Sequence, residues 1–162
     1  MHVDDTAGQR TAGGIVRPPP LFLALILLGL ALDRLLPLAS GHHRGDAIHW
    51  IIGGSLIITG FGLATVAIRN FHRAGTPVRR IEPTRALVTT GVHAWSRNPI
   101  YVGMFLIYGG IGVAARSSWM LVLTLPLALT MRYGVVAREE AYLEQRFGDD
   151  YRAYKARVRR WL

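Results

Sequence analysis

Two polar segments hold the residue types that can bind and orient a small charged molecule, and each borders an apolar run. The first, residues 75–103, contains three prolines and therefore cannot form one helix. The second, residues 138–162, opens with the adjacent carboxylates Glu139 and Glu140. Carboxylates bind amines and hydroxyl groups, and aromatic rings face cations, so these segments suit the binding and positioning of a ligand.

An apolar helix is predicted to begin at Pro99, near the end of the first segment. Proline suits the first helical turn, and Asn98 before it is predicted to cap the helix. The N-terminus of this helix leaves backbone N–H groups free at the membrane surface. Such groups bind carboxylates or phosphates.

The second segment is predicted to be the end of a long helix, a break at Phe147-Gly148, and then a short amphipathic helix. In that last helix four apolar or aromatic residues recur at helical spacing among basic ones. They are Tyr151, Tyr154, Val158 and Trp161. This pattern is typical of a helix that lies in the membrane interface.

Long apolar runs must position these segments. Apolar residues make up 51% of the 162-residue chain, and they lie in four runs, which indicates a membrane protein rather than a soluble domain. The runs are 21–39, 51–68, 100–115 and 119–137. We predict an all-α integral membrane protein with about four transmembrane helices. The last two are expected to form a helical hairpin, followed by a cytoplasmic C-terminal amphipathic helix, and Pro126 is expected to kink the fourth helix.

Glycines crowd the second and third apolar runs. They are Gly53, Gly54, Gly60 and Gly62 in the second run, and Gly103, Gly109, Gly110 and Gly112 in the third. Small residues let helices approach closely in lipid, so both groups are predicted to be helix-packing positions.

The basic residues predict the topology. Four spans would place 16 of the 19 Lys and Arg residues on the side of the two tails and the middle segment, and 3 on the other. The positive-inside bias puts the richer side, with both termini and the site, in the cytoplasm, and in a bacterium this means the inner membrane. Residues 1–19 are then a cytoplasmic tail and residues 20–162 a single membrane domain. The charge is explained by topology and contact with membrane lipids, and no nucleic-acid partner is expected.

No metal site is expected. The chain has no cysteine, and His42, His43 and His49 are predicted to lie in a polar loop between the first two helices, opposite the proposed site. Asp33 is predicted to pair locally with Arg34 at the membrane edge.

The run L-V-T-T-G-V-H-A-W-S-R-N-P-I-Y-V-G (residues 87–103) resembles the cofactor motif of the isoprenylcysteine carboxyl methyltransferase family, of which related membrane phospholipid methyltransferases share a looser version. The pattern E-E-x-x-L-x-x-x-F-G-x-x-Y-x-x-Y (residues 139–154) resembles the second motif of the family. The resemblance covers roughly residues 75–160, where an apolar hairpin separates the two motifs. The first two helices match only in hydropathy.

The resemblance implies a methyltransferase that uses S-adenosyl-L-methionine in a cytoplasmic pocket closed by the C-terminal segment. The acceptor would be a lipid-like or prenyl-type molecule that enters from the bilayer. Residues that match cofactor contacts of the family are Arg85, Ala86, Leu87, Val88, His93, Asn98, Pro99, Ile100, Tyr101 and one of Glu139 and Glu140. The rings of Tyr101 and Trp95 are also expected to pack on the adenine of the cofactor or to face its sulfonium. Carboxyl O-methylation is the first expectation, because a carboxylate is already a nucleophile at neutral pH. Amine N-methylation, which needs a base, is the second.

The chain departs from the family at three places. Asn98 replaces a histidine, His93 replaces a tyrosine, and the arginine that holds the substrate carboxylate in the family has no direct counterpart. Arg132 and Arg138 are the candidates to replace it in orienting the substrate.

Plainer roles remain open for several of these residues. The two glutamates can be solvated helix-end charges, Tyr101 an interfacial anchor and Arg97 a topology signal. The whole chain can also be a non-catalytic membrane scaffold or lipid-binding subunit. The sequence sets no oligomeric state.

Overall fold

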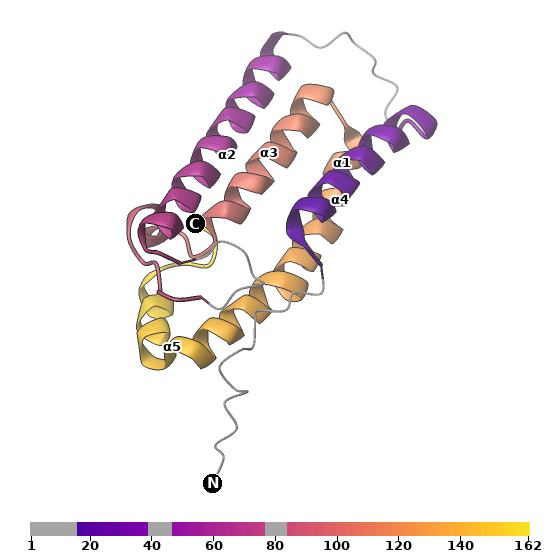
Figure 1. The fold of residues 1–162 in the computed structure, drawn as a ribbon. Coiled ribbons are helices and arrows are strands. Elements are labelled where there is room, and N and C mark those ends of the chain that lie inside the picture. Colours follow the sequence, from indigo (N-terminus) through magenta and orange to yellow (C-terminus); the bar gives the residue numbers. More distant parts are fainter. Residues whose placement is uncertain (1–15, 39–46, 77–83) are drawn as a thin grey trace.

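The part of the chain that the structure describes contains helices and no strand, which confirms the all-α fold class for those residues. The computed structural model describes residues 16–38, 47–76 and 84–162 (Figure 1). Its elements are α1 (Pro18–Leu35), α2 (Ala47–Arg73), the 3₁₀ turn η2 (Gly91–Ala94), α3 (Pro99–Ala115), α4 (Ser118–Leu129), the π-helical segment η3 (Thr130–Val136) and α5 (Ala137–Arg157).

Some sequence predictions concern residues outside the described ranges. Besides residues 1–15 of the N-terminal tail, these are His42, His43, Arg44, Pro77, Arg79, Arg80 and Pro83. His49, which was expected in the first connecting loop, lies instead in the first turn of α2.

Among the described residues, three helical stretches are long and apolar enough to cross a membrane: α1, α2 and the stretch Ser118–Arg157. Large apolar side chains point outward from them, for example Ile58 and Leu121, which are 75% and 77% exposed. Such an exterior suits contact with lipid. α3 has 17 residues and spans about 25 Å, less than the roughly 30 Å of a bilayer core, so a fourth span stays a prediction.

Four glycines bring α2 and α3 together in an antiparallel pair. Gly53 lies opposite Gly110, and Gly60 lies opposite Gly103. A Cβ atom added at any of the four would lie 2.5–2.7 Å from the backbone oxygen of the opposite glycine, so the two backbones can be this close only without side chains there. The packing role is therefore confirmed for these four positions.

The other four glycines do not serve this contact. Gly54, Gly62 and Gly109 have no atom within 4 Å of an added Cβ, and Gly112 faces the side chain of Met120 on α4. The connection between α3 and α4 is tight, as predicted, because Arg116 adopts a left-handed conformation (φ 54°). The most extensive packing of α3, however, is with α2.

α1 packs against α4, where Gly29 meets Met120 (Figure 1). At one end of this pair, the hydroxyl of Ser117 donates a hydrogen bond to the Asp33 carboxylate and accepts one from the Met120 N–H at 3.0 Å. The Trp119 N–H also donates to Asp33, at 3.3 Å. The predicted local role of Asp33 is therefore wrong, because its carboxylate is used to join α1 to the N-terminus of α4, where free N–H groups favour a negative charge.

The last helix carries the site residues. It continues through Pro126 and changes to the π form at Thr130, so Pro126 does not end it. Further on, Gly148 has φ 53° and ψ −121°, which confirms the predicted break, since this conformation is open mainly to glycine.

The predicted interfacial face after Gly148 is wrong for the tyrosines. Tyr151 and Tyr154 are 1% and 3% exposed, so they face the interior of the protein. The helix ends at Arg157, and Val158 is extended (φ −117°, ψ 130°), so Trp161 does not belong to that helix. The surface attachment of this helix to a membrane stays a prediction.

The glycine contact predicts a position-specific effect of added methyl groups. Gly60→Ala or Gly103→Ala should destabilise the protein by about 1–3 kcal/mol, because the new Cβ meets a backbone oxygen that cannot move aside. Gly62→Ala is the matched control and should be neutral or stabilising by about 0.5–1 kcal/mol, because its Cβ meets open space. Thermal unfolding in detergent measures the effects. Equal effects in all three variants would contradict the packing assignment.

Candidate functional site

The loop before α3 (residues 84–98) forms hydrogen bonds with α2, with Thr76 just after α2, and with α5. The N–H groups of Arg85 and Ala86 donate to the buried Thr76 hydroxyl at 2.9 and 3.4 Å. The Thr84 N–H donates to the Tyr142 hydroxyl at 3.2 Å. The backbone of the predicted 85–88 stretch is therefore held in place at its beginning.

His93, within this loop, has a buried and neutral side chain. Its ring packs edge-on against Phe71, with centroids 4.9 Å apart, and its carbonyl accepts a hydrogen bond from the Tyr154 hydroxyl at 2.6 Å. Burial lowers the pKa of His93 to about 4, because the charged form would lose its hydration. His93 is therefore neutral at pH 7, both of its ring nitrogens are buried without a hydrogen-bond partner among the described residues, and its predicted contact with a cofactor stays a prediction.

Glu140 is the centre of a buried ionic cluster. Arg160 binds it through two nitrogens, with Nε–Oε1 at 3.0 Å and Nη2–Oε2 at 2.6 Å. Arg97 Nη2 lies 3.0 Å from Oε1. The side chains of Glu140 and Arg97 are each 8% exposed, so solvent screens the contact weakly.

Positive charge is in excess within this cluster. One carboxylate serves two guanidinium groups, and Arg97 has two further buried nitrogens, Nε and Nη1, for which the described residues provide no hydrogen-bond acceptor. Buried donors without partners are costly, and an anionic group is the partner that they suit.

Glu139 has different surroundings from its neighbour. Its Oε1 accepts a hydrogen bond from the Tyr101 hydroxyl at 3.0 Å, and its side chain is partly exposed. Tyr101 lies in the first turn of α3, so this contact joins the two predicted motifs. Adjacent helical residues point about 100° apart, which is why the two glutamates reach different partners.

Residues 158–162, which we call the strap, lie across the loop and the start of α3. The Arg97 N–H donates to the Arg159 carbonyl at 3.0 Å, and Asn98 Nδ2 donates to the Arg160 carbonyl at 2.9 Å. Asn98 occupies the N-cap position but its side chain makes no capping bond, because it binds the strap instead. That capping prediction is therefore wrong, whereas Pro99 does begin the helix.

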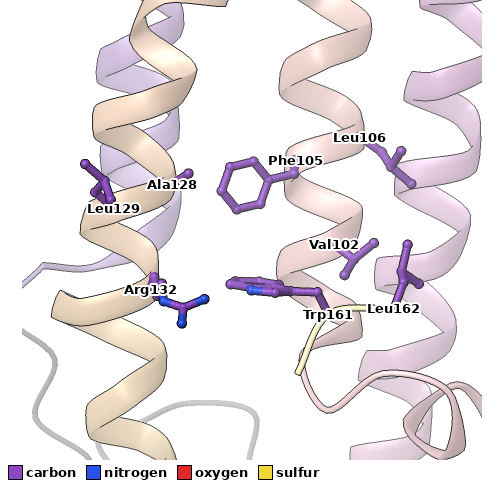
Figure 2. Close-up of a pocket in the computed structure, with 8 residues that line it drawn as sticks. All are labelled: Val102, Phe105, Leu106, Ala128, Leu129, Arg132, Trp161 and Leu162. Atoms are coloured by element: carbon purple, nitrogen blue, oxygen red, sulfur yellow. The ribbon is translucent and has the colours of Figure 1, made fainter. Parts of the chain in front are cut away.

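The strap also forms one side of an apolar pocket of about 440 Å³ (Figure 2). Its lining residues are Val102, Phe105 and Leu106 of α3, Ala128, Leu129 and Arg132 of α4 and η3, and Trp161 and Leu162 of the strap. Figure 2 shows the Trp161 ring reaching across the pocket toward Arg132. Among these lining residues Arg132 is the only charged one.

The predicted site residues fall into two groups. The structure gathers Asn98, Pro99, Tyr101, Glu139 and Glu140 around the strap and the start of α3. Ile100 lies in the same helical turn, and Leu87 and Val88 lie in the loop, where Val88 is buried. Trp95 is 80% exposed, and the side chains of Arg85 and Arg138 are also exposed, so these three stand apart from the cluster.

Sequence reasoning missed Arg160 and Trp161 as site residues. It assigned Arg160 to topology and Trp161 to a membrane-surface helix. The signal that bears on both is Gly148, because a break there lets the chain turn back toward α3.

Two comparisons place the chain among known proteins. Residues 48–150 match the family model described as phospholipid methyltransferase. The protein-S-isoprenylcysteine O-methyltransferase of Saccharomyces cerevisiae is 33% identical over 121 residues, which cover 67% of this chain and 46% of that protein. An uncharacterized protein of Haemophilus influenzae is 70% identical over 27 residues, 17% of this chain and 43% of that protein. The chain thus spans less than half the length of these curated relatives.

Removing the negative charge of Glu140 from the ionic cluster should lower the stability of the protein strongly. Glu140→Gln should destabilise the protein by about 3 kcal/mol, because it leaves the buried Arg97 guanidinium, and the partly exposed one of Arg160, without a counter-charge. Glu144→Gln is the control, since Glu144 pairs with Lys155 on the surface and should cost under about 1 kcal/mol. Unfolding in detergent gives both values. A loss at Glu140 no greater than at Glu144 would show that the cluster does not stabilise the fold.

Proposed function

The chain belongs to the phospholipid methyltransferase family, and we propose that it transfers a methyl group from S-adenosylmethionine to a lipid-like acceptor at the membrane. The resemblance found in the sequence is confirmed at the level of the family. The cofactor, the acceptor and the carboxyl chemistry described next are proposals that rest on the geometry of the site.

The proposal rests on one observation, which is that the ionic cluster and the apolar pocket lie next to each other. Consecutive strap residues belong to the two places, Arg160 to the cluster and Trp161 to the pocket. Methyl transfer requires a polar donor and its acceptor to be held in line. A charged surface that continues into an apolar pocket supports such an arrangement for an acceptor with an apolar chain.

The residues of the cluster fit S-adenosylmethionine. The Arg97 nitrogens that have no acceptor among the described residues suit its carboxylate, and the Glu139 carboxylate suits its amino group or ribose hydroxyls. Tyr101, whose hydroxyl binds Glu139, supplies an aromatic ring beside this carboxylate, and aromatic rings attract cations such as a sulfonium. When bound, the cofactor would supply a methyl group on a sulfonium, which is electrophilic without further activation. The task of the chain is then to orient the two molecules and to exclude water.

The pocket supports a carboxylate as the methyl acceptor. The Arg132 guanidinium carries a positive charge and several N–H donors in a planar fork, so it is suited to bind an anionic carboxylate. An amine acceptor would be cationic at neutral pH, would be repelled by Arg132 and would need a base to remove its proton. A carboxylate needs neither, so carboxyl O-methylation of an amphiphile with an apolar chain is the proposed reaction.

We also propose that both termini and the site face the cytoplasm, as the distribution of basic residues supports. The chain has no cysteine, so a single introduced cysteine reports its own side of the membrane. His43→Cys should react with an impermeant maleimide added to intact cells, and Arg159→Cys should react only after lysis. The reverse pattern would overturn this topology.

Binding and transfer measurements test the function. Detergent-purified protein should bind S-adenosylhomocysteine in calorimetry, and with labelled cofactor it should form a base-labile methyl ester on an S-prenylated N-acetylcysteine. Base-stable product on an amine lipid would indicate N-methylation instead. Absence of cofactor binding would favour the non-catalytic scaffold.

Two charge-removing variants refine this test. Glu139→Gln should weaken cofactor binding about ten- to a hundredfold, the loss of a charge-assisted hydrogen bond. Arg132→Gln should raise KM for the acceptor by a similar factor with cofactor affinity unchanged. Arg152→Gln, on the exposed end of α5, is the control and should change neither quantity. If Arg138→Gln rather than Arg132→Gln raised KM, Arg138 would be the acceptor-binding arginine.

A further inference from the structure

We propose that Trp161 is a specificity-determining residue, whose indole forms the wall of the acceptor pocket next to the head group, and that the ionic cluster holds it there. The inference rests on the proposed function. It adds a selective element that lies outside both sequence motifs and after the end of α5.

Trp161 is placed to touch an acceptor. Its ring packs edge-on against Phe105 of α3, with centroids 6.0 Å apart and planes at 89°. The rest of the ring faces the pocket and reaches toward Arg132 (Figure 2). An anionic head group bound at Arg132 would therefore have the indole beside it, and the first part of the apolar chain would pack between Trp161 and α3.

The strap has no regular secondary structure to fix this ring. Besides its apolar contacts, such as the one with Phe105, its position depends on three polar contacts of the two preceding residues: Arg97 N–H with the Arg159 carbonyl, Asn98 Nδ2 with the Arg160 carbonyl, and the Arg160 side chain with Glu140. Arg160 and Trp161 are adjacent, so loosening the guanidinium from Glu140 frees the indole to leave the pocket wall. Arg160 is thus a positioning residue for Trp161.

A role in packing alone does not explain this arrangement. Core aromatic residues of this chain, such as Tyr108 and Tyr151, are 2% and 1% exposed. Trp161 is only partly buried and borders an open pocket. Its ring is held in position by neighbouring contacts and still has a surface that borders the pocket. Such a ring is suited to bind a flat or branched apolar group.

Intrinsic fluorescence tests the placement without relying on turnover. Titration with N-acetyl-S-farnesyl-cysteine should change the tryptophan emission of the parent protein and of Trp50→Phe, whose tryptophan lies exposed in the first turn of α2. The change should be absent in Trp161→Phe. An unaltered change in Trp161→Phe would overturn the proposal, whether or not the protein is catalytically active.

Kinetics test the selectivity. The preference in kcat/KM for the farnesyl acceptor over a straight-chain S-dodecyl acceptor should change about tenfold in Trp161→Ala, with S-adenosylhomocysteine affinity unchanged. An unchanged preference would overturn the assignment while the methyltransferase function stands. Absence of methyl transfer by the parent protein would instead contradict the proposed function.

A double-mutant cycle tests the link to the cluster. Arg160→Gln should reproduce the change in preference, and the pair Arg160→Gln/Trp161→Ala should be no worse than Trp161→Ala alone. Arg159→Gln, an exposed neighbour whose backbone contact is retained, should behave like the parent. Additive effects of Arg160 and Trp161 would overturn the positioning role of Arg160.

Discussion

The carboxylate of Glu140 is a contact on which the arrangement of the site depends, because it binds arginines from two parts of the chain that are far apart in the sequence. Arg97 belongs to the loop before α3 and Arg160 to the strap, while Glu140 itself lies on α5. Each desolvated charge is costly, so the cluster holds together only while all three groups are present. This side chain thus contacts both the loop and the strap from the last helix, and it adds to the hydrogen bonds that join the loop directly to the strap and to α5.

The two helix pairs provide the frame for that contact. The glycines of α2 and α3 allow backbone contact and so fix where α3 begins, with Tyr101 in its first turn. The Asp33 and Ser117 contact joins α1 to the start of α4, from which one continuous helix leads to Arg132 and to both glutamates. The pocket and the cluster are therefore placed by contacts at the far end of the helices as well as by local ones.

The sequence predicted what local chemistry and apolar periodicity determine. The all-helical fold of the described residues, the helix start at Pro99 and the break at Gly148 follow from side-chain types, and both motifs led to the family. It did not predict which glycines pack, because that depends on which face of α2 meets α3. It also missed Arg160, 20 residues from Glu140, since only the return of the chain after Gly148 brings the two together. Asn98 was misassigned because the strap competes for its side chain.

The excess of positive charge in the site offers a reason for the presence of a buried ionic cluster. Apolar residues of similar volume often stabilise a protein at least as well as a buried ion pair, so stability alone is a weak reason to keep three charged groups here. A cluster with two arginines and one carboxylate differs from a balanced pair because it has a net positive charge, and two buried nitrogens of Arg97 have no acceptor among the described residues. Arg132 is a separate cation in an otherwise apolar pocket, and the strap contributes to both places, with Arg160 in the cluster and Trp161 in the pocket. Under the proposed function the carboxylate of the methyl donor and that of the acceptor would each find a cation, and Trp161 would separate them.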